Sequence, residues 1–176
     1  MDREFFLSLL EFVLLLLLVI LPIRFFLFEP FLVRGQSMEP NFHNFDYLII
    51  DKLTYHFRNP QRGEVVVFKP PFDDHVYYIK RVIGLPGEKI EIEESKIVIF
   101  NKEHPQGFVL NEDYLKGHYT LGKIEVNLGP DEYFVLGDNR EVSYDSRKWG
   151  PVKRERISGK VVLQISLIKL AQAFIK

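Results

Sequence analysis

Cysteine is absent from the 176 residues of this chain. Without thiols the protein can have no disulfide framework, no thiolate nucleophile and no cysteine-based metal site. An excess of charge is absent too, because 23 Lys and Arg residues face 24 Asp and Glu residues, a formal net charge of −1. Nucleic-acid-binding proteins normally have a clear basic excess, so we predict no nucleic-acid partner. The five histidines have no His-x-x-x-His spacing, and we predict neither a metal site nor a cofactor.

An apolar run dominates the N-terminal region. From 5 to 28 the sequence is almost entirely Phe, Leu, Val and Ile, interrupted by Ser8, Glu11, Pro22 and Arg24. A helix of roughly two dozen residues is about 36 Å long, which is enough to cross the hydrocarbon core of a bilayer. No small-x-small cleavage site of a removable leader follows the run. We therefore predict a retained single-pass anchor over 1–30 in a lipid bilayer. The flanking charges are too few to fix its orientation.

The remainder of the chain, 31–176, has the pattern of a β domain. Short runs rich in Val, Ile, Tyr and Phe are separated by turn signals such as Asn59-Pro60 and Pro86-Gly87. The expected strands cover 47–51, 65–68, 77–83, 89–93, 96–100, 123–127, 132–136 and 159–165. Helical periods are missing between them, which favours antiparallel pairing. We predict a mainly β fold, in which an N-terminal transmembrane helix precedes an antiparallel β-sheet domain with a variable hairpin or loop over about 101–129.

The last segment, 167–175, is apolar with interspersed Lys and Gln residues. It is too short and too charged to span a bilayer again. An amphipathic helix there could lie on the membrane or pack against the β domain, and the sequence leaves both alternatives open.

A serine closely follows the anchor, in the segment 33–40, which reads Val-Arg-Gly-Gln-Ser-Met-Glu-Pro. A lone surface serine is far more often a hydrogen-bonding or turn residue than a nucleophile. For Ser37 to act as a nucleophile it needs a neighbouring base, because a free hydroxyl is a poor nucleophile.

Lys80 is the candidate base. It lies in the expected strand 77–83, among apolar and aromatic neighbours, where the alternation of side chains places every second one in the protein interior. On the strand pattern alone, a solvated lysine paired with a glutamate is the commoner arrangement. Burial of a lysine, however, disfavours its charged form, lowers its pKa and lets the neutral amine take a proton. We hypothesise that Lys80 is buried and serves Ser37 as its base, a known variant of the serine triad.

A third segment, 136–147, reads Leu-Gly-Asp-Asn-Arg-Glu-Val-Ser-Tyr-Asp-Ser-Arg. Taken alone, it offers a good turn and a possible ion pair. Together with the Ser-Met-x-Pro of 37–40 and the Tyr-Ile-Lys-Arg-Val-Ile-Gly-Leu-Pro-Gly of 78–87, it resembles the three boxes of the bacterial type I signal peptidases. The resemblance covers the anchor and nearly all of the body, and it is thinnest between about 101 and 129.

The resemblance implies a role for each matching residue. Ser37 is the expected nucleophile and Lys80 the general base, with Ser143 hydrogen-bonded to the Lys80 amine. Met38 is expected to border the substrate pocket. The supporting residues are a salt bridge of Asp145 with Arg147, the turn-shaping Asp138 and Arg140, and a structural Arg81.

The oxyanion donors are only partly implied. The backbone N–H of Ser37 is the expected first donor. Some family members add a side-chain hydroxyl two residues earlier, where this chain has Gly35, so the second donor stays open between water and another amide.

The implied function is that of a membrane-bound serine endopeptidase. It would remove signal peptides from exported preproteins, cutting after a small-x-small motif through an acyl-enzyme, with its catalytic domain on the extracytoplasmic side of the plasma membrane. A non-catalytic, membrane-tethered β-domain binding module is the alternative, and such a module would tolerate Ser37→Ala and Lys80→Met. Self-cleaving repressors share the Ser/Lys chemistry but carry a DNA-binding domain and no membrane span.

Overall fold

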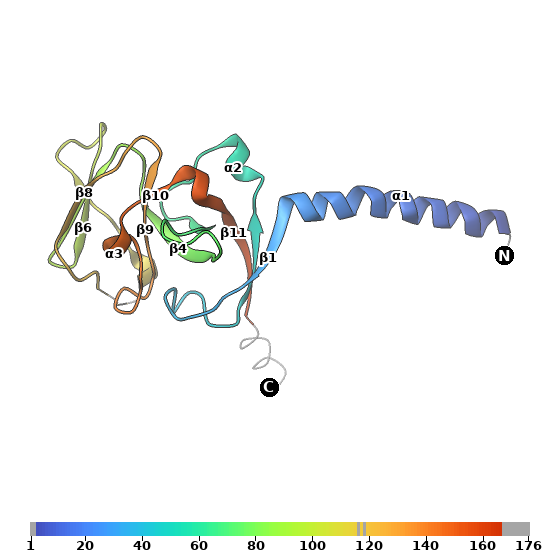
Figure 1. Ribbon diagram of the computed structural model, residues 1–176, viewed down its shortest axis with the longest axis horizontal. Coiled ribbons are helices and arrows are strands. Elements are labelled where there is room, and N and C mark those ends of the chain that lie inside the picture. The colour runs from blue at the N-terminus through green and yellow to red at the C-terminus, as the bar shows by residue number, and fades with distance from the viewer. Residues whose placement is uncertain (1–2, 116, 118, 167–176) are drawn as a thin grey trace.

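The computed structural model describes residues 3–115, 117 and 119–166, with the backbone alone for 22–28. Its first element is the long helix α1, Arg3–Leu27 (Figure 1). Within the described residues this is the one helix long and apolar enough to cross a membrane, with a mean hydropathy of 2.6 over Arg3–Leu21 and none of that stretch buried. The length and composition of this helix agree with the predicted anchor.

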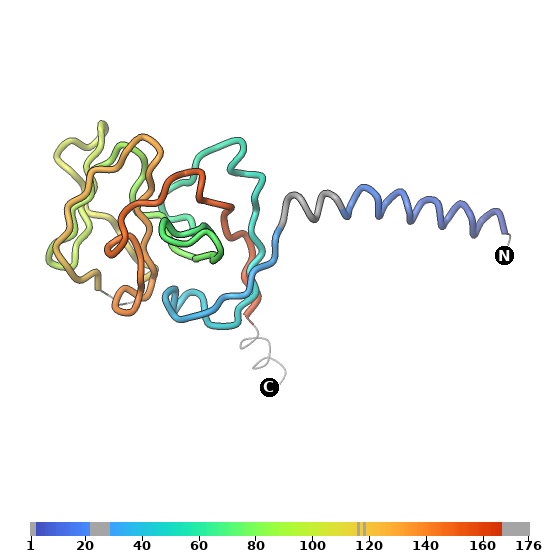
Figure 2. Tube along the Cα trace, in the orientation of Figure 1, coloured from blue at the N-terminus to red at the C-terminus, as the bar shows by residue number. Residues whose placement is uncertain are grey.

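Most of the body is a seven-stranded sheet in the order β1-β2-β11-β3-β4-β9-β10. Its strands are β1 Phe28–Leu32, β2 Tyr47–Asp51, β3 Val65–Phe68, β4 Tyr78–Gly84, β9 Glu132–Leu136, β10 Val152–Lys153 and β11 Ile157–Ile165. All the pairs are antiparallel. The last strand, β11, lies between two early ones, β2 and β3, so the end of the described chain is built into the middle of the sheet (Figures 1 and 2).

A second sheet of four strands, in the order β7-β6-β5-β8, forms one end of the body (Figure 1). Its strands are β5 Lys89–Glu93, β6 Lys96–Phe100, β7 Phe108–Val109 and β8 Ile124–Asn127. The short helical elements are α2 Thr54–Phe57, α3 Ser146–Trp149, and the 3₁₀ turns η1 Asp113–Leu115 and η2 Arg154–Arg156. Two apolar clusters hold this architecture, one centred on β3 and β9, the other between β9 and the small sheet.

The strand pattern of the sequence is confirmed at all eight predicted runs, five of them with identical bounds. Charged and apolar residues alternate in β5, which has its Ile side chains buried and its charged side chains outward, and all four residues of β3 are buried. Three strands were missed. β7 and β10 have only two residues each, and β1 continues the apolar composition of the anchor. The structure therefore starts the sheet at Phe28, so the predicted boundary between residues 30 and 31 falls inside β1.

The strands β1, β2 and β11 carry an apolar outer face. Because side chains alternate along a strand, the registered rows Leu32–Tyr47–Ile165 and Pro30–Ile49–Leu163 point to the same side. Five of these six side chains are exposed and Ile49 is partly exposed, whereas Leu48 and Ile50 on the opposite side are buried. This face belongs to the strand that continues directly from α1. The predicted amphipathic segment 167–175 lies outside the described residues.

Candidate active site

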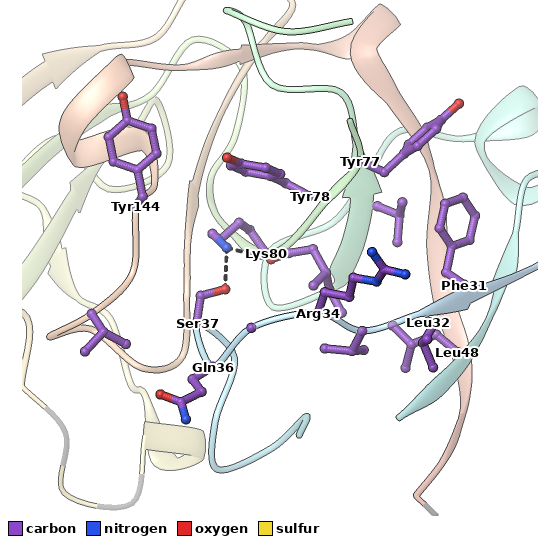
Figure 3. Close-up of a pocket in the computed structure, with 15 residues that line it drawn as sticks. Phe31, Leu32, Arg34, Gln36, Ser37, Leu48, Tyr77, Tyr78, Lys80 and Tyr144 are labelled. Atoms are coloured by element: carbon purple, nitrogen blue, oxygen red, sulfur yellow. Dashed lines mark hydrogen bonds between the residues drawn. The ribbon is translucent and has the colours of Figure 1, made fainter. Parts of the chain in front are cut away.

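Ser37 and Lys80 lie next to each other in the lining of a cleft. Ser37 lies in the loop after β1, and Lys80 lies in the middle of β4. The Lys80 Nζ donates a hydrogen bond to Ser37 Oγ at 2.6 Å and a second one to the Ile79 carbonyl at 2.9 Å. Figure 3 shows the two side chains pointing toward each other. The arrangement brings an amine within proton-transfer distance of a hydroxyl that is 43 residues away in sequence.

Burial makes Lys80 an unusual lysine. It is 3% exposed, because it points to the same side of β4 as the buried Val82. The loss of solvation lowers the pKa of its amine from 10.5 to about 8, although the negative charges of Asp145 and Asp138 act to raise this pKa. A lysine with this pKa is neutral in about a tenth of the molecules at pH 7, and in half of them at pH 8. In that state the Ser37 hydroxyl can donate to Nζ in the same geometry.

The loop that carries Ser37 is fixed from both sides. Val33 N–H donates to the Asp46 carbonyl at 2.9 Å, and Gly35 N–H donates to Asn44 Oδ1 at 2.9 Å. Gly35 has φ +101°, a left-handed conformation in which a side chain would be strained. The position therefore offers no hydroxyl, and its amide is already engaged by Asn44.

The turn 137–140 contacts the backbone of Ser37. Asn139 N–H donates to the Ser37 carbonyl at 3.0 Å. A Cβ at Gly137 would collide with the Ser37 carbonyl and with the side chain of Ser143, so a side chain at this position has no room. Gly137 N–H donates to Asp145 Oδ2 at 3.1 Å. Ser37 is therefore positioned by backbone contacts with a turn that lies a hundred residues later in sequence.

Three ion pairs surround this turn. Arg147 Nε lies 2.8 Å from Asp145 Oδ1, and its NH2 lies 2.9 Å from Oδ2. Asp138, fully buried, accepts from Arg81 Nε at 2.8 Å and NH2 at 2.5 Å. Arg140 pairs with Glu112. Forked guanidinium–carboxylate pairs fix orientation as well as charge, so each pair restricts the turn.

Two of the sequence-based roles do not match the geometry. Ser143 Oγ is buried and has no hydrogen-bond partner within the described residues, whereas Lys80 bonds to Ser37 and Ile79 instead. Met38 is 1% exposed and is not among the residues that line the cleft. The reason is local, since the chain turns at Met38, whose carbonyl accepts from Phe42 N–H at 2.9 Å, and its side chain is directed into the interior.

The cleft has a volume of about 550 Å³. Its lining residues are 31–37 on one side, 77–80 on the other, and Leu48, Val67, Val142 and Tyr144. The ring centroids of Phe31 and Tyr77 are 5.2 Å apart, and this edge-to-face pair lies at the end of the cleft away from Ser37 (Figure 3). Residues 31–32 of the edge strand β1 and residues 78–80 of β4 each leave one strand edge unpaired, so the cleft can accept an extended chain. No group of three or more potential metal ligands assembles among the residues that the structure describes.

Comparison with known proteins decides the family. A family model described as signal peptidase, peptidase S26, matches residues 6–166. A probable signal peptidase I-2 from Synechocystis is 38% identical over 149 residues, which cover 81% of this chain and 65% of that protein. Signal peptidase I P of Bacillus subtilis subsp. natto is 35% identical over 145 residues, 77% of this chain and 75% of that protein. The chain belongs to the signal peptidase family, peptidase S26.

A solved member of the signal peptidase family agrees with this fold. The crystal structure of a signal peptidase I from Enterococcus faecalis matches with a TM-score of 0.51 at 31% identity, covering 60% of this chain and 98% of that chain. The family match begins within α1 and ends with the described residues of the large sheet, so it takes in the apolar helix and both sheets.

The sequence motifs did not predict some of the residues that lie near the site. Glu112 and Tyr114 lie in the segment where the resemblance is thinnest, and no local motif marks them. Asn41 donates to both the Tyr114 carbonyl (2.9 Å) and Asp138 Oδ2 (2.8 Å), and so connects that segment to the turn 137–140. Only the tertiary structure brings the three together.

Proposed function

We propose that this protein is a membrane-bound serine endopeptidase that removes N-terminal signal peptides from exported preproteins, cutting after a small-x-small motif. One observation carries the proposal. A buried lysine amine with a lowered pKa lies 2.6 Å from a serine hydroxyl at an open cleft, in a member of a signal peptidase family. A lysine and serine paired in this way, at the edge of a chain-sized groove, form a nucleophile and its base.

The reaction follows from the dyad. Neutral Lys80 takes the proton of the Ser37 hydroxyl as Oγ attacks the scissile carbonyl carbon, and the carbonyl oxygen becomes an oxyanion facing the Ser37 N–H. The Lys80 ammonium then gives this proton to the leaving amine as the peptide bond breaks. The leader remains as an ester on Ser37. Lys80, neutral again, takes a proton from a water that attacks the ester carbonyl carbon. The bond between that carbon and Ser37 Oγ then breaks, the Lys80 ammonium returns the proton to Oγ, and the leader leaves as a free carboxylic acid.

The cleft is suited to an extended leader. Residues 78–80 of β4 pair with β3 on one side, but pairing with β9 begins only at Arg81. Their second edge is therefore available to a substrate strand, which the segment 31–37 would flank from the opposite side. Because β1 continues directly from the anchor, the membrane-embedded part of a leader would approach past Phe31 and Tyr77, with the scissile bond at Ser37.

We propose that the apolar wall of the cleft receives the small side chains of the leader. Leu48, Val67 and Ile79 give the cleft an apolar lining. A preprotein with small residues at the first and third positions before the scissile bond would place both toward this wall, because alternate residues of a strand point to one side. This supports the small-x-small specificity implied by the family.

The apolar surfaces of the protein support membrane attachment. The exposed helix α1 continues directly into β1, one of the three strands with the apolar outer face, and contact with lipid would stabilise both surfaces. We place the anchor in the plasma membrane and the β domain on the extracytoplasmic surface, where exported preproteins emerge. Membrane attachment would keep the cleft near the bilayer that holds the leader's own hydrophobic segment.

Cleavage of a purified preprotein in detergent tests the proposal. We expect the wild-type protein to cut after a small-x-small site, and Ser37→Ala and Lys80→Met to abolish cleavage while remaining folded. Ser158→Ala and Lys102→Met, outside the cleft, are the matched controls and should cut normally. Normal cleavage by the two dyad variants would refute the dyad. If no protein cuts, including the wild type, the binding-module alternative is favoured, and preprotein binding is the next measurement.

A further inference from the structure

An ion pair joins the variable segment of the chain to the turn 137–140. Glu112 lies between β7 and β8, on the chain that connects strands of the small sheet. Its Oε1 accepts from Arg140 NH2 at 2.5 Å and its Oε2 from NH1 at 3.0 Å. The Arg140 side chain is 0% exposed and that of Glu112 is 10% exposed. This is a forked, largely buried pair, and its two hydrogen bonds fix the relative orientation of the two side chains.

Arg140 is connected to Ser37 through the turn 137–140. Its Nε donates to the Gly137 carbonyl at 3.0 Å, which closes the turn 137–140 on itself. The same turn donates the Asn139 N–H to the Ser37 carbonyl at 3.0 Å. A line of direct contacts therefore runs from Glu112 through Arg140 and the turn to the backbone of the nucleophile. Each step is a hydrogen bond, and the side-chain steps are buried.

The surroundings keep Glu112 in place. Tyr114 O–H donates to Glu112 Oε1 at 2.6 Å, and the Tyr114 ring lies under the Arg81 guanidinium, 4.1 Å from the ring centroid. Thr120 Oγ1 also accepts from Arg140. A buried guanidinium without its carboxylate is strongly unfavourable, so the loss of the Glu112 charge would force Arg140 toward solvent and away from Gly137.

We propose that Glu112 is a positioning residue for the nucleophile: through Arg140 it sets the turn 137–140, and thereby the Ser37 backbone, in the geometry needed for acylation. The proposal rests on the proposed peptidase function for its kinetic consequence, but not for its structural one. A displacement of about 1 Å at a reacting atom can lower the rate about a hundredfold. A segment outside the three motif boxes thus determines how well the dyad works.

Glu112→Gln is the test, since it keeps the shape of the side chain and removes its charge. Glu88→Gln is the matched control. Glu88 is also buried (6% exposed) and pairs with Arg62 at 2.6 Å, and its partners Arg62, Leu85 and Asn101 lie outside the turn and the Ser37 loop. Cleavage of a preprotein by the full chain in detergent gives kcat and KM. Hydrogen exchange of the Asn139 amide reports on its bond to Ser37 without any need for activity.

For Glu112→Gln we expect kcat to fall at least about tenfold with KM within about twofold, and the Asn139 amide to exchange faster. Glu88→Gln should lower the thermal midpoint but leave kcat and the Asn139 exchange unchanged. Equal losses in the two variants, in proportion to the unfolded fraction, would show that Glu112 is merely structural and overturn the proposal. So would an unchanged Asn139 exchange in Glu112→Gln.

If Glu112→Gln does not fold, Tyr114→Phe takes its place, because it removes only the hydroxyl that donates to Glu112 and accepts from Arg140 NH2 at 3.4 Å. The same two changes are then expected at smaller amplitude, and their absence overturns the proposal. If the wild-type protein cuts no preprotein, the proposed function fails, but the Asn139 exchange of the variants still decides whether Glu112 positions the turn.

Discussion

Lys80→Met should make the protein more stable at neutral pH while it abolishes activity. Burial lowers the pKa of the Lys80 amine from 10.5 to about 8. At 1.36 kcal/mol per unit, the desolvated ammonium therefore destabilises the fold by about 3 kcal/mol at pH 7. Methionine fills a similar volume without a charge. The hydrogen bonds from Nζ to Ser37 and Ile79 are lost, at about 1 kcal/mol each, which leaves a net gain of about 1 kcal/mol.

The pH dependence is the sharper part of this prediction. Between pH 8 and pH 10.5 the unfolded chain holds a proton on Lys80 that the folded protein has released, so the stability of the wild type rises with pH in this window. Residue 80 does not titrate in Lys80→Met. The stability advantage of the variant should therefore shrink by about 3 kcal/mol from pH 7 to pH 10.5 and change sign.

Urea unfolding of both proteins at several pH values, in the same detergent, measures this difference. Trp149 is the single tryptophan and packs against Phe68 and Phe72, so its fluorescence reports on the folding of the β domain. Lys102→Met, at an exposed site, is the control and should show no such pH-dependent difference from the wild type. If the difference between Lys80→Met and the wild type is constant from pH 7 to pH 10.5, the lysine has a normal pKa and the base assignment fails.

Three further predictions concern the dyad and its support. The acylation rate should rise about tenfold between pH 7 and pH 9 and level off above the Lys80 pKa of about 8, because only the neutral amine is a base; a flat single-turnover profile would contradict this. Asp145→Asn should shift the midpoint of that profile to lower pH, since the Asp145 charge raises the pKa of Lys80, and an upward shift would refute the electrostatic account. Gly137→Ala should destabilise the fold by about 1–3 kcal/mol and abolish cleavage, because the added Cβ collides with the Ser37 carbonyl. Gly122→Ala is the comparison variant, because its added Cβ would meet no atom within 4 Å. Normal cleavage by Gly137→Ala would disprove the close approach of Gly137 to Ser37.

The sequence by itself determined the elements of this fold, because their signals are local. The alternation of Ile and charged residues over 89–93 predicts which face of the strand is buried. The apolar run of α1 predicts a lipid environment for the helix. The three motif boxes indicated the family, which the comparisons confirm, and they predicted the dyad residues in the same way. Their residues lie next to one another in the chain, so their spacing can be recognised without knowledge of the fold.

The tertiary structure alone decided what these residues contact. The burial of Lys80 depends on its neighbours in the folded sheet, and the insertion of β11 between β2 and β3 is a pairing across more than a hundred residues. The inward side chain of Met38 and the unbonded Ser143 follow from the paths of two loops, which periodicity does not encode. Glu112 meets Arg140 only because the small sheet carries it there. Local pattern sets the type of an element, whereas the partner of a side chain is set by the packing of distant segments.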